Sequence, residues 1–250
     1  MVNHLPILTF HTLDDLPSVL SFSTAVFQCG MAKLNESGHQ TVSLLQAVDC
    51  LSQRKPFVNR SIVITFDDGY QTVYEKAFPV LQSYGMSATV FLTVGKRGLM
   101  KPMDRFPSLN GRPMLNWHEI REMQRWGFNF GAHTVTHPDL THLPLETIAT
   151  EIYESQKIIE DALGISVPCF AYPYGLYDHP IYELVQARFA CACSDRLGLV
   201  TMRSNPYTLE RVDGYYLRTD HLFDLMLTRW LPWYLRARNL PRRLRRAIQF

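Results

Sequence analysis

Hydrophobic residues along the chain gather in short runs that alternate with longer, more polar stretches. Short apolar or β-branched runs bounded by turn-forming residues are typical of strands that are buried on both faces. The runs are Leu5–Phe10, Ser61–Phe66, Ala88–Val94, Phe128–Gly131, Cys169–Tyr172, Phe189–Cys193 and, with a weaker pattern, Leu209–Val212. They predict seven buried strands.

Segments of helical length separate most of these runs. They are Thr41–Gln53, Tyr70–Tyr84, Trp117–Trp126, Leu145–Leu163 and Tyr177–Arg188. Gly85, Gly127 and Gly164 each follow one of these segments, at the place where a left-handed residue commonly ends a helix. Strands that alternate with helices predict an α/β fold with a parallel sheet, and seven strands favour a closed barrel over an open sheet.

Polar residues stand at the ends of the predicted strands. This position matters because a parallel α/β barrel carries its reactive groups at the C-terminal ends of the strands. The residues are His11 after the first strand, Asp67 and Asp68 after the second, His133 after the fourth, Tyr174 after the fifth, Asp195 after the sixth, and Arg211 and Asp213 at the seventh. The candidate chemistry therefore lies where a barrel needs it.

The composition is that of one globular domain. The chain has 250 residues, 46% of them hydrophobic, and no linker or repeat divides it. The segment Lys96–Asn116 shows no periodicity, which indicates either a substrate-binding loop or lid, or a surface insertion. An odd number of cysteines, 5, without a CxxC pair argues against a disulfide framework and against a zinc site built from cysteines.

The first motif, TFDDGY at residues 65–70, ends a buried run in two adjacent carboxylates. Like charges this close repel each other unless a cation or a shared proton compensates them. A divalent metal resolves the conflict if one carboxylate binds the metal and the other takes a proton from water that the metal activates. The alternative is a surface turn, because Asp and Gly are both turn formers.

The second motif is HTVTH at residues 133–137. If this segment is helical, His133 and His137 share one face and can bind one ion. Alone the pair is a weak signal, because histidine is common in loops. Combined with a carboxylate from Asp67 or Asp68, it forms a ligand set that suits zinc or another transition metal with open coordination positions.

The third motif is FAYPYG at residues 170–175, which ends a predicted strand in a tight turn. Such a turn exposes an aromatic wall and backbone N–H groups, which can hold a developing oxyanion. Taken by itself, the motif is only a turn.

In this order and at these spacings, the three motifs resemble the polysaccharide deacetylase family (carbohydrate esterase family 4, the NodB homology domain). The resemblance extends from Leu5 to Asp213. It implies a distorted (β/α)7 barrel of the NodB type. The site that it implies consists of Asp67 as general base, Asp68, His133 and His137 as ligands of a divalent metal, with zinc favoured, and Tyr174 as the residue whose backbone N–H faces the oxyanion.

Two positions depart from the pattern of the family. The family turn usually begins with an arginine that pairs with the base, but the corresponding residue here is Ala171. Another residue must orient Asp67, and Arg211 is a candidate by its position. The usual C-terminal Leu-x-His motif, which supplies the general acid, is also not evident, because His221 lacks a preceding apolar strand.

His11 offers a better general acid. The segment LTFH at residues 8–11 ends an apolar strand in a histidine. This arrangement resembles the circularly permuted branch of the family, which includes biofilm poly-N-acetylglucosamine deacetylases and places that strand first. FAYPYG resembles the same branch. We therefore assign the acid to His11 and keep His221 in reserve; the alternative is a histidine that simply ends a strand.

The resemblance implies a metal-dependent hydrolase that removes N-acetyl groups from amino sugars of a polysaccharide or a lipid-linked glycan. Asp67 takes a proton from the attacking water, the metal and the turn stabilise the oxyanion, and protonated His11 donates to the departing nitrogen. Two alternatives stay open: a non-catalytic glycan-binding domain on the same fold, and a deacylase or deformylase of a non-polymeric substrate.

Positive charge is concentrated at the C-terminus. Residues 228–250 contain seven arginines and no acidic residue, so the net charge of +2 leaves −5 for residues 1–227. We therefore divide the chain into a deacetylase domain, 1–227, and a basic aromatic tail, 228–250. The aromatic stretch Trp230–Leu235 beside arginines suits contact with a membrane of anionic lipids. The alternative is a basic helix that packs on the barrel through its leucines and tryptophans.

Two further classes are not expected. No recognised binding module accompanies the basic tail, so the sequence does not predict a nucleic-acid partner. The first residues lack the basic and apolar regions of a signal peptide, and no apolar run approaches the roughly 20 residues of a membrane span. We expect a cytoplasmic protein, whose tail either contacts a membrane or packs on the barrel.

Overall fold

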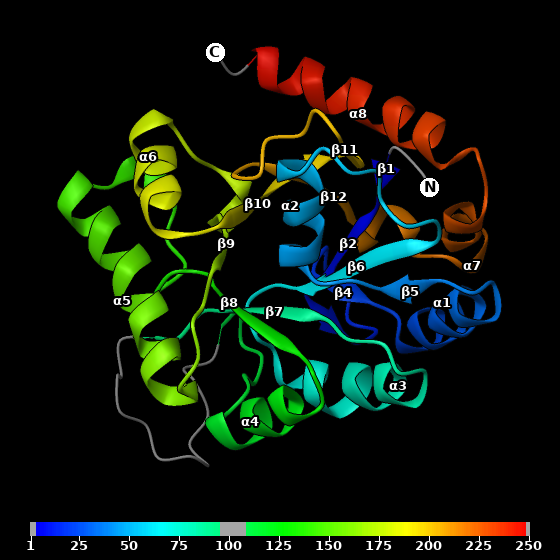
Figure 1. Cartoon of the computed structure of the whole chain (residues 1–250), viewed down its shortest axis with the longest axis horizontal. Helices are drawn as coiled ribbons and strands as arrows, with labels where there is room; N and C mark the ends of the chain where they lie inside the picture. Colours follow the sequence, from blue (N-terminus) through cyan, green and yellow to red (C-terminus); the bar gives the residue numbers. More distant parts are fainter. Residues whose placement is uncertain (1–3, 96–108, 249–250) are drawn as a thin grey trace.

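The fold comes from a computed structural model that describes residues 4–95 and 109–248, with side chains described up to residue 240. Seven parallel strands form its centre (Figure 1). They are β2 (Ile7–Phe10), β6 (Ser61–Phe66), β7 (Thr89–Leu92), β8 (Asn129–Ala132), β9 (Cys169–Ala171), β10 (Cys191–Leu197) and β12 (Leu209–Asp213). Each predicted apolar run therefore contains or overlaps a barrel strand.

The sheet closes on itself. The hydrogen-bonded order is β2-β12-β10-β9-β8-β7-β6, and β6 pairs again with β2, so β2 lies between β6 and β12; the two-residue strand β5 (Gln40–Thr41) also pairs with β6. Thr9 of β2 is in register with Thr65 of β6 on one side and with Asp213 of β12 on the other. All of these pairs are parallel, which confirms the predicted seven-stranded barrel.

Helices surround the barrel. The helices are α1 (Thr24–Glu36), α2 (Leu44–Ser52), α3 (Phe78–Ser83), α4 (Trp117–Arg125), α5 (Leu145–Leu163) and α6 (His179–Arg188). Figure 1 shows α2 in front of the strands and the helices α1, α3, α4, α5 and α6 around them. The bounds of α5 match the prediction, and Gly164 ends this helix with φ of 66°. The predicted helix over 70–84 is present as residues 71–83, but its segment η1 (Val73–Ala77) is π-helical and leads directly into α3.

The sequence did not predict α1, although its buried residues repeat with helical spacing. One of them is Gly30, whose lack of a side chain has a packing reason. An added Cβ at Gly30 would lie 2.6 Å from the ring of Phe223. The glycine therefore lets α1 pack closely against α7 (Asp220–Phe223), and it weakens the apolar pattern by which such a helix is found.

The barrel has a packed interior separate from the core beneath the outer helices. Its apolar side chains include Leu5, Ile7, Val63, Phe91, Cys169, Cys191 and Cys193, together with Leu44 and Leu51 from α2. All five cysteines are free thiols, as expected. Because α2 closes one end of this interior, polar side chains can emerge only at the other end, where the strands finish.

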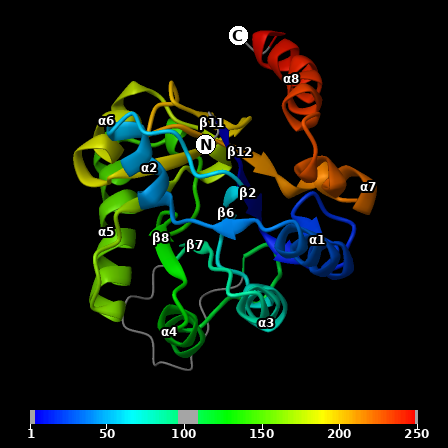
Figure 2. The same ribbon diagram turned by 45° about the vertical axis from the view of Figure 1, so that its right-hand side comes forward.

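Several short elements and one longer helix, α8, complete the described chain. They are β1 (His4–Leu5), β3 (Thr12–Leu13), β4 (Ser21–Phe22), β5 (Gln40–Thr41), β11 (Val200–Thr201), η2 (Leu140–His142), η3 (Pro173–Gly175), η4 (Gly214–Leu217), η5 (Asp224–Leu227) and α8 (Leu231–Ile248). Figure 2 shows α8 outside the ring of helices, with its C-terminal part leading away from the barrel. None of the described helices is long and apolar enough to cross a membrane.

Of the segment in which the sequence predicts a loop, lid or insertion, residues 96–108 lie outside the described residues. The described remainder, 109–116, returns to the barrel. Leu109 and Arg112 form an isolated bridge, and Met114 bridges to Tyr70 directly after the TFDDG segment. This segment therefore reaches the edge of the region where the strands end.

Candidate active site

A pocket of about 630 Å³ lies at the C-terminal ends of the barrel strands. The sequence-predicted residues that line it are His11, Asp67, Asp68, His133, His137, Tyr174, Asp195, Arg211 and Asp213. Asp195 lies within β10 (Cys191–Leu197) and not after it, because that strand is longer than predicted. The predicted site residues are thus brought together, apart from the reserve acid His221.

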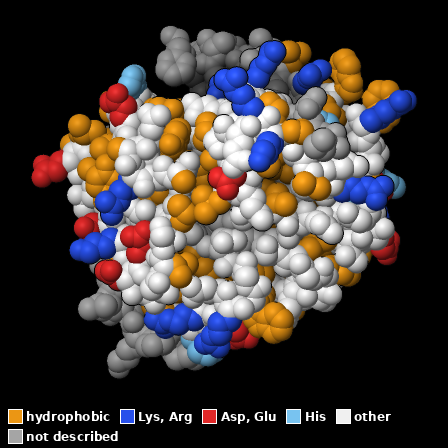
Figure 3. All heavy atoms as spheres, viewed as in Figure 1, with side chains coloured by type: hydrophobic (Ala, Val, Ile, Leu, Met, Phe, Trp, Pro, Cys, Tyr) orange, Lys and Arg blue, Asp and Glu red, His pale blue; other side chains and the backbone are white. Residues whose placement is uncertain are grey.

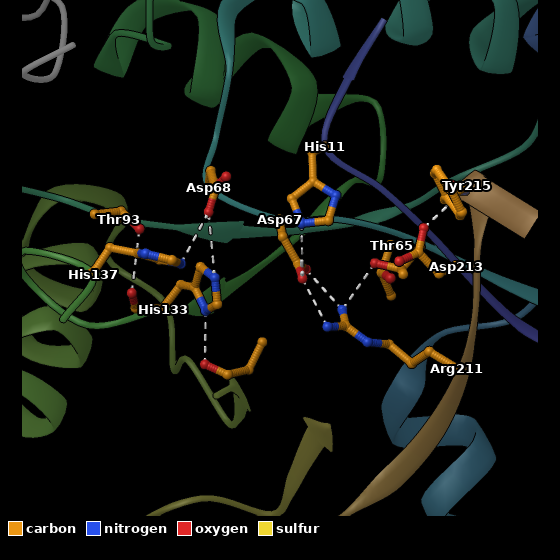
Figure 4. A network of polar contacts seen from close by, with 12 residues as sticks. His11, Thr65, Asp67, Asp68, Thr93, His133, His137, Arg211, Asp213 and Tyr215 are labelled. Atoms are coloured by element: carbon orange, nitrogen blue, oxygen red, sulfur yellow. Dashed lines mark hydrogen bonds and ion pairs between the residues drawn. The ribbon is translucent and has the colours of Figure 1, made fainter. Parts of the chain in front are cut away.

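Asp67 and Asp68 are equally buried, at 3% exposed each, but their carboxylates face different partners (Figure 4). Side chains alternate along a strand, so Asp67 continues the row of β6 that points into the barrel, with Thr65 before it. Asp68 has a φ of 72°, a left-handed conformation that non-glycine residues rarely adopt. A continued strand would point Asp68 to the outer face of the barrel, whereas this turn keeps its carboxylate at the pocket, beside partners other than those of Asp67.

Asp67 forms a bidentate ion pair with Arg211. Both guanidinium contacts, from Nη1 to Oδ1 and from Nη2 to Oδ2, measure 2.7 Å. Arg211 is itself buried and fixed, because it also donates to Thr9 Oγ1 at 2.9 Å and to the carbonyl of Ser194 at 3.0 Å. The residue that orients Asp67 in place of the family arginine is therefore Arg211, as its position had suggested.

The ion pair determines the charge of Asp67. Burial alone would raise the pKa of this carboxyl, but the charge of Arg211 and its two hydrogen bonds outweigh burial and hold the pKa well below its usual range. Asp67 is therefore ionised across the physiological range. Bidentate geometry also fixes the plane of the carboxylate.

His11 lies directly after β2 and lines the pocket, with 22% of its side chain exposed. Its Nε2 is 4.0 Å from Oδ2 of Asp67. The other candidate acid, His221, is exposed on α7 and is not among the residues that line the pocket. Position therefore favours His11 over His221 as a group that can reach a substrate.

Asp68 faces two imidazoles. Nε2 of His133 and Nε2 of His137 each lie 3.4 Å from Oδ1 of Asp68. The potential ligand atoms of the three residues all lie within 4.8 Å of one another. Nδ1 of His133 donates to the carbonyl of Ala171 at 2.7 Å, which leaves Nε2 as the ligand atom. Figure 4 shows the two rings converging on this carboxylate.

This group fits a divalent cation. Oδ1 of Asp68 is buried and has no hydrogen-bond partner among the described residues, which is costly for a carboxylate oxygen unless a cation completes its environment. Burial, followed by the charge of His133, lowers the pKa of His137 to about 4, so this imidazole is neutral at pH 7. Two imidazoles and one carboxylate with open positions match zinc and similar transition metals.

The second motif does not form a helix. His133 and His137 converge through a bent loop in which Thr134 and His137 have φ of 66° and 57°. The helical turn that would place both rings on one face is therefore absent, although the two rings converge as expected. Such left-handed residues are strained and persist only where the surroundings hold them.

Glu151 of α5 holds this loop. Its Oε2 accepts hydrogen bonds from the backbone N–H groups of Val135 and Thr136, both at 2.8 Å, and its Oε1 accepts one from the hydroxyl of Thr136 at 2.7 Å. Glu151 is buried. Its role was not predicted from the sequence, where the signal was a charged residue on the face of α5 that also carries Ile148, Ile152 and Ile159.

The third motif forms a tight turn beside the imidazoles. Tyr174 has a φ of 56°, and its ring, 59% exposed, lies 4.6 Å from the ring of His137 between centroids. At Gly175, with φ of 67°, an added Cβ would lie 2.2 Å from the side chain of Asp195. Only glycine fits there, so the turn holds Tyr174 at the rim of the pocket.

Other side chains at the rim were not predicted. Tyr215 and Tyr216 line one side of the pocket, and the loop with Val19 lines another. That loop is held by Asp14, which receives a hydrogen bond from Arg112 at 3.2 Å. Rim residues of this kind carry no motif, because contact with a ligand depends on loop geometry.

Several proteins are similar in sequence to this chain. The family model described as polysaccharide deacetylase matches residues 54–189. YxkH of Bacillus subtilis, named as a candidate polysaccharide deacetylase, is 28% identical over 209 residues, which cover 83% of this chain and 70% of that protein. The poly-beta-1,6-N-acetyl-D-glucosamine N-deacetylase of Staphylococcus aureus is 29% identical over 189 residues, 70% of this chain and 60% of that enzyme. The chain thus spans less than two thirds of the S. aureus enzyme.

Solved structures share the fold. IcaB from Ammonifex degensii aligns with a TM-score of 0.75 and 22% identity over 93% of this chain and 97% of that one. The deacetylase PplD of Streptococcus pyogenes, solved with acetate, aligns with a TM-score of 0.75 and 22% identity over 85% of this chain and 93% of that one. This likeness confirms the (β/α)7 barrel of the NodB type. Because the family model covers more than half of its length, the chain belongs to the polysaccharide deacetylase family.

Proposed function

We propose that the protein is a metal-dependent hydrolase that removes N-acetyl groups from the amino sugars of a glycan. The observation that carries the proposal is the division of labour between Asp67 and Asp68 in one pocket. Asp67 is paired with Arg211 and ionised, while Asp68 and two imidazoles form a group that fits a cation. A hydrolase of this class needs both a proton acceptor and an electrophile beside the reacting carbonyl.

Asp68, His133 and His137 would hold the metal, for which their two nitrogens and one oxygen favour zinc. When bound, the cation supplies Lewis-acid chemistry that polarises the acyl carbonyl and lowers the pKa of water. The chain orients its ligands in advance. His133 is fixed through its bond to Ala171, and the loop of His137 is fixed through Glu151.

The chain also supplies two proton transfers. Asp67 accepts a proton from the water whose oxygen attacks the acyl carbon, and Arg211 keeps this carboxylate ionised and oriented beforehand. His11, in its protonated form, donates a proton to the amide nitrogen as the carbon–nitrogen bond breaks, because an unprotonated amide nitrogen is a poor leaving group. The products are acetate and a free amino sugar.

The turn at 173–175 completes the proposed site. We assign the backbone N–H of Tyr174 to the oxyanion that develops on the acyl oxygen, since the turn stands beside His137 at the pocket rim. The exposed ring of Tyr174 and that of Tyr215 offer flat apolar surfaces on which the face of a sugar ring can lie.

The S. aureus relative is named for poly-β-1,6-N-acetylglucosamine, which makes oligomers of this sugar the first substrate to test. We expect the purified protein to release acetate from them, to lose this activity in a chelator, and to regain it with added zinc. Metal content, measured in parallel, should fall and return with activity.

The outcomes separate the alternatives. Binding of the oligomers without release of acetate would identify a glycan-binding domain and overturn the proposal. Undiminished acetate release from fully metal-stripped protein would also overturn it. Release from small acylated amides but not from any amino-sugar oligomer would replace the substrate with a non-polymeric one.

A further inference from the structure

Helix α8 lies on the barrel through few of its described side chains. Leu231 and Leu235, one helical turn apart, are buried at 5% and 2% exposed. The hydroxyl of Tyr234 donates to the backbone carbonyl of Tyr216 at 2.6 Å, and the amide of Asn239 donates to the carbonyl of Leu197. These contacts fix the first half of α8 and leave its other face outward.

The outward face carries large apolar side chains. Trp230, at the start of α8, is 57% exposed, Trp233 is 63% exposed and Leu240 is 64% exposed. Leu227, just before them, is 40% exposed. A cluster of exposed indoles and leucines on one short segment is unusual for a surface that meets only water, and marks a surface that meets a partner.

Arginines are interleaved with these indoles. The guanidinium of Arg229 lies 5.2 Å from the ring centre of Trp230, and that of Arg236 lies 5.3 Å from the ring centre of Trp233. In sequence, residues 228–250 carry seven arginines and no acidic residue. Figure 3 shows Lys and Arg side chains and hydrophobic ones along the upper edge of the molecule, where α8 lies in Figure 1.

This combination is complementary to one kind of partner. Tryptophans favour the zone between headgroups and acyl chains, where the apolar ring is buried and the N–H stays hydrated. Arginines beside them bind lipid phosphates and are attracted by a negative surface potential. An acidic protein would match the positive charge of the arginines but would leave the indoles of Trp230 and Trp233 without an apolar environment.

We propose that Trp230 and α8 form a docking surface for a bilayer that contains anionic lipids, with the helix lying in the plane of the headgroups. The surface is peripheral, since α8 is not apolar enough to cross a membrane. It is also coupled to the pocket, because Tyr234 bonds the backbone of Tyr216, whose side chain lines the pocket. Docking would therefore hold the pocket close to the bilayer surface.

The test is sedimentation of the full chain with vesicles of phosphatidylcholine alone and of phosphatidylcholine mixed with phosphatidylglycerol. We expect binding to the mixed vesicles only, weakened by added salt because screening reduces the attraction. The double variant Trp230→Ala/Trp233→Ala should bind at least about tenfold more weakly, since it lacks the two indoles that docking would bury in the bilayer. Arg229→Gln/Arg236→Gln, with both indoles kept, should weaken binding and reduce its dependence on salt.

Trp126→Ala is the matched control. Trp126 is 59% exposed and follows α4, on the opposite side of the molecule from α8 (Figure 1). It should bind like the unaltered chain, and all variants should keep the same circular dichroism spectrum. No binding to anionic vesicles, equal binding to both vesicle types, or equal loss in the Trp126 variant would overturn the proposal. So would preferential binding of RNA or DNA fragments in the same assay.

Discussion

The two sides of the site differ in how the negative charge of a buried carboxylate is compensated. Asp67 and Asp68 are neighbours on one strand end and are equally buried. On the Asp67 side, Arg211 supplies a permanent positive charge through two hydrogen bonds. On the Asp68 side, two imidazoles face a carboxylate oxygen that no hydrogen bond satisfies among the described residues. One charge is compensated by the protein itself, whereas the other belongs to a group that could hold a cation.

This difference shows how two adjacent carboxylates acquire separate roles. A buried carboxylate with a bidentate arginine is fixed in charge and direction, which suits a group that acts on protons at a set position. A buried carboxylate that faces two imidazole nitrogens in a pocket suits an exchangeable ion. The left-handed φ of 72° at Asp68 keeps both carboxylates at the same pocket, where each has different partners.

The largest effect should come from substituting the two carboxylates one at a time. Asp67→Asn should lower kcat by about 10²–10⁴-fold, the usual contribution of a general base, while the content of bound metal stays unchanged. Asp68→Asn should lower both kcat and the affinity for zinc, the latter by more than about 100-fold because a direct ligand is lost. Acetate release and metal analysis on the same samples measure the two quantities.

The pattern matters more than either number. If Asp67→Asn loses its metal, or Asp68→Asn retains it, the assignment of roles to the two sides is wrong. Asn is the appropriate replacement because it keeps the shape of the side chain, removes the charge and replaces one acceptor oxygen with an NH2 donor. Circular dichroism of both variants checks that the barrel remains folded.

A second prediction concerns the fixed cation. Arg211→Met leaves Asp67 as a buried carboxylate without its partner and should lower the free energy of unfolding by about 3–5 kcal/mol. The double variant Arg211→Met/Asp67→Asn should recover part of that loss, since no uncompensated charge remains. Urea denaturation of the three proteins measures this, and a double variant no more stable than Arg211→Met would contradict the ion-pair argument.

The Asp67–Arg211 ion pair also predicts how the stability of the fold depends on pH. With Arg211 present, the pKa of Asp67 is lower in the folded than in the unfolded protein, so its ionisation stabilises the fold above about pH 4 and this is lost as the pH falls. In Arg211→Met, burial alone raises the folded pKa, so ionisation destabilises the fold at neutral pH and acid relieves it. The difference in free energy of unfolding between the unaltered chain and Arg211→Met should therefore become smaller as the pH falls from 7 to about 5. Urea denaturation in the presence of a chelator measures it.

Much of the fold follows from the sequence because burial on both faces of a barrel strand produces an apolar run. Ser61–Phe66 was predicted with its observed bounds, since all six of its residues are buried. Where burial is one-sided or interrupted, the pattern is weaker. Thr24–Glu36 was missed, and its buried stripe contains Gly30. The division of the chain at residues 227 and 228 stays a prediction.

The site divides in the same way. Residues at strand ends could be placed because a barrel brings all strand ends together, which gathered His11, Asp67 and His133 from distant parts of the chain. Local backbone conformation could not be predicted. Nothing in HTVTH specifies positive φ at Thr134 and His137. The two imidazole rings converge as expected, but through a bent loop and not through the helical turn that the spacing suggested.

The fourth prediction compares two histidines. His11→Ala should lower kcat by about 10²-fold, because His11 stands beside Asp67 in the pocket and is assigned the proton donor role. His221→Ala should leave kcat within about twofold of the unaltered chain, because this residue is exposed on α7 outside the pocket. Acetate release at saturating substrate decides between them, and a larger loss in His221→Ala would transfer the acid role.

The smallest effect should come from Glu151, which touches no reacting group but holds the loop of the metal side. Glu151→Ala leaves three donors of that loop without their acceptor and should lower zinc affinity by about 10–100-fold, the effect usual for a residue that supports a ligand. Glu151→Gln keeps an acceptor for the two N–H groups and should restore most of that affinity, at a stability cost of about 1 kcal/mol.

Glu154→Ala is the control for Glu151, because Glu154 is an exposed glutamate on the same helix. Its zinc affinity should equal that of the unaltered chain, which would show that loss of a carboxylate from α5 is not enough by itself. The comparison also separates positioning from simple destabilisation. If Glu151→Ala lowers the free energy of unfolding but binds zinc normally, Glu151 supports the barrel and not the metal loop, and the strained φ angles at Thr134 and His137 must be held by other contacts.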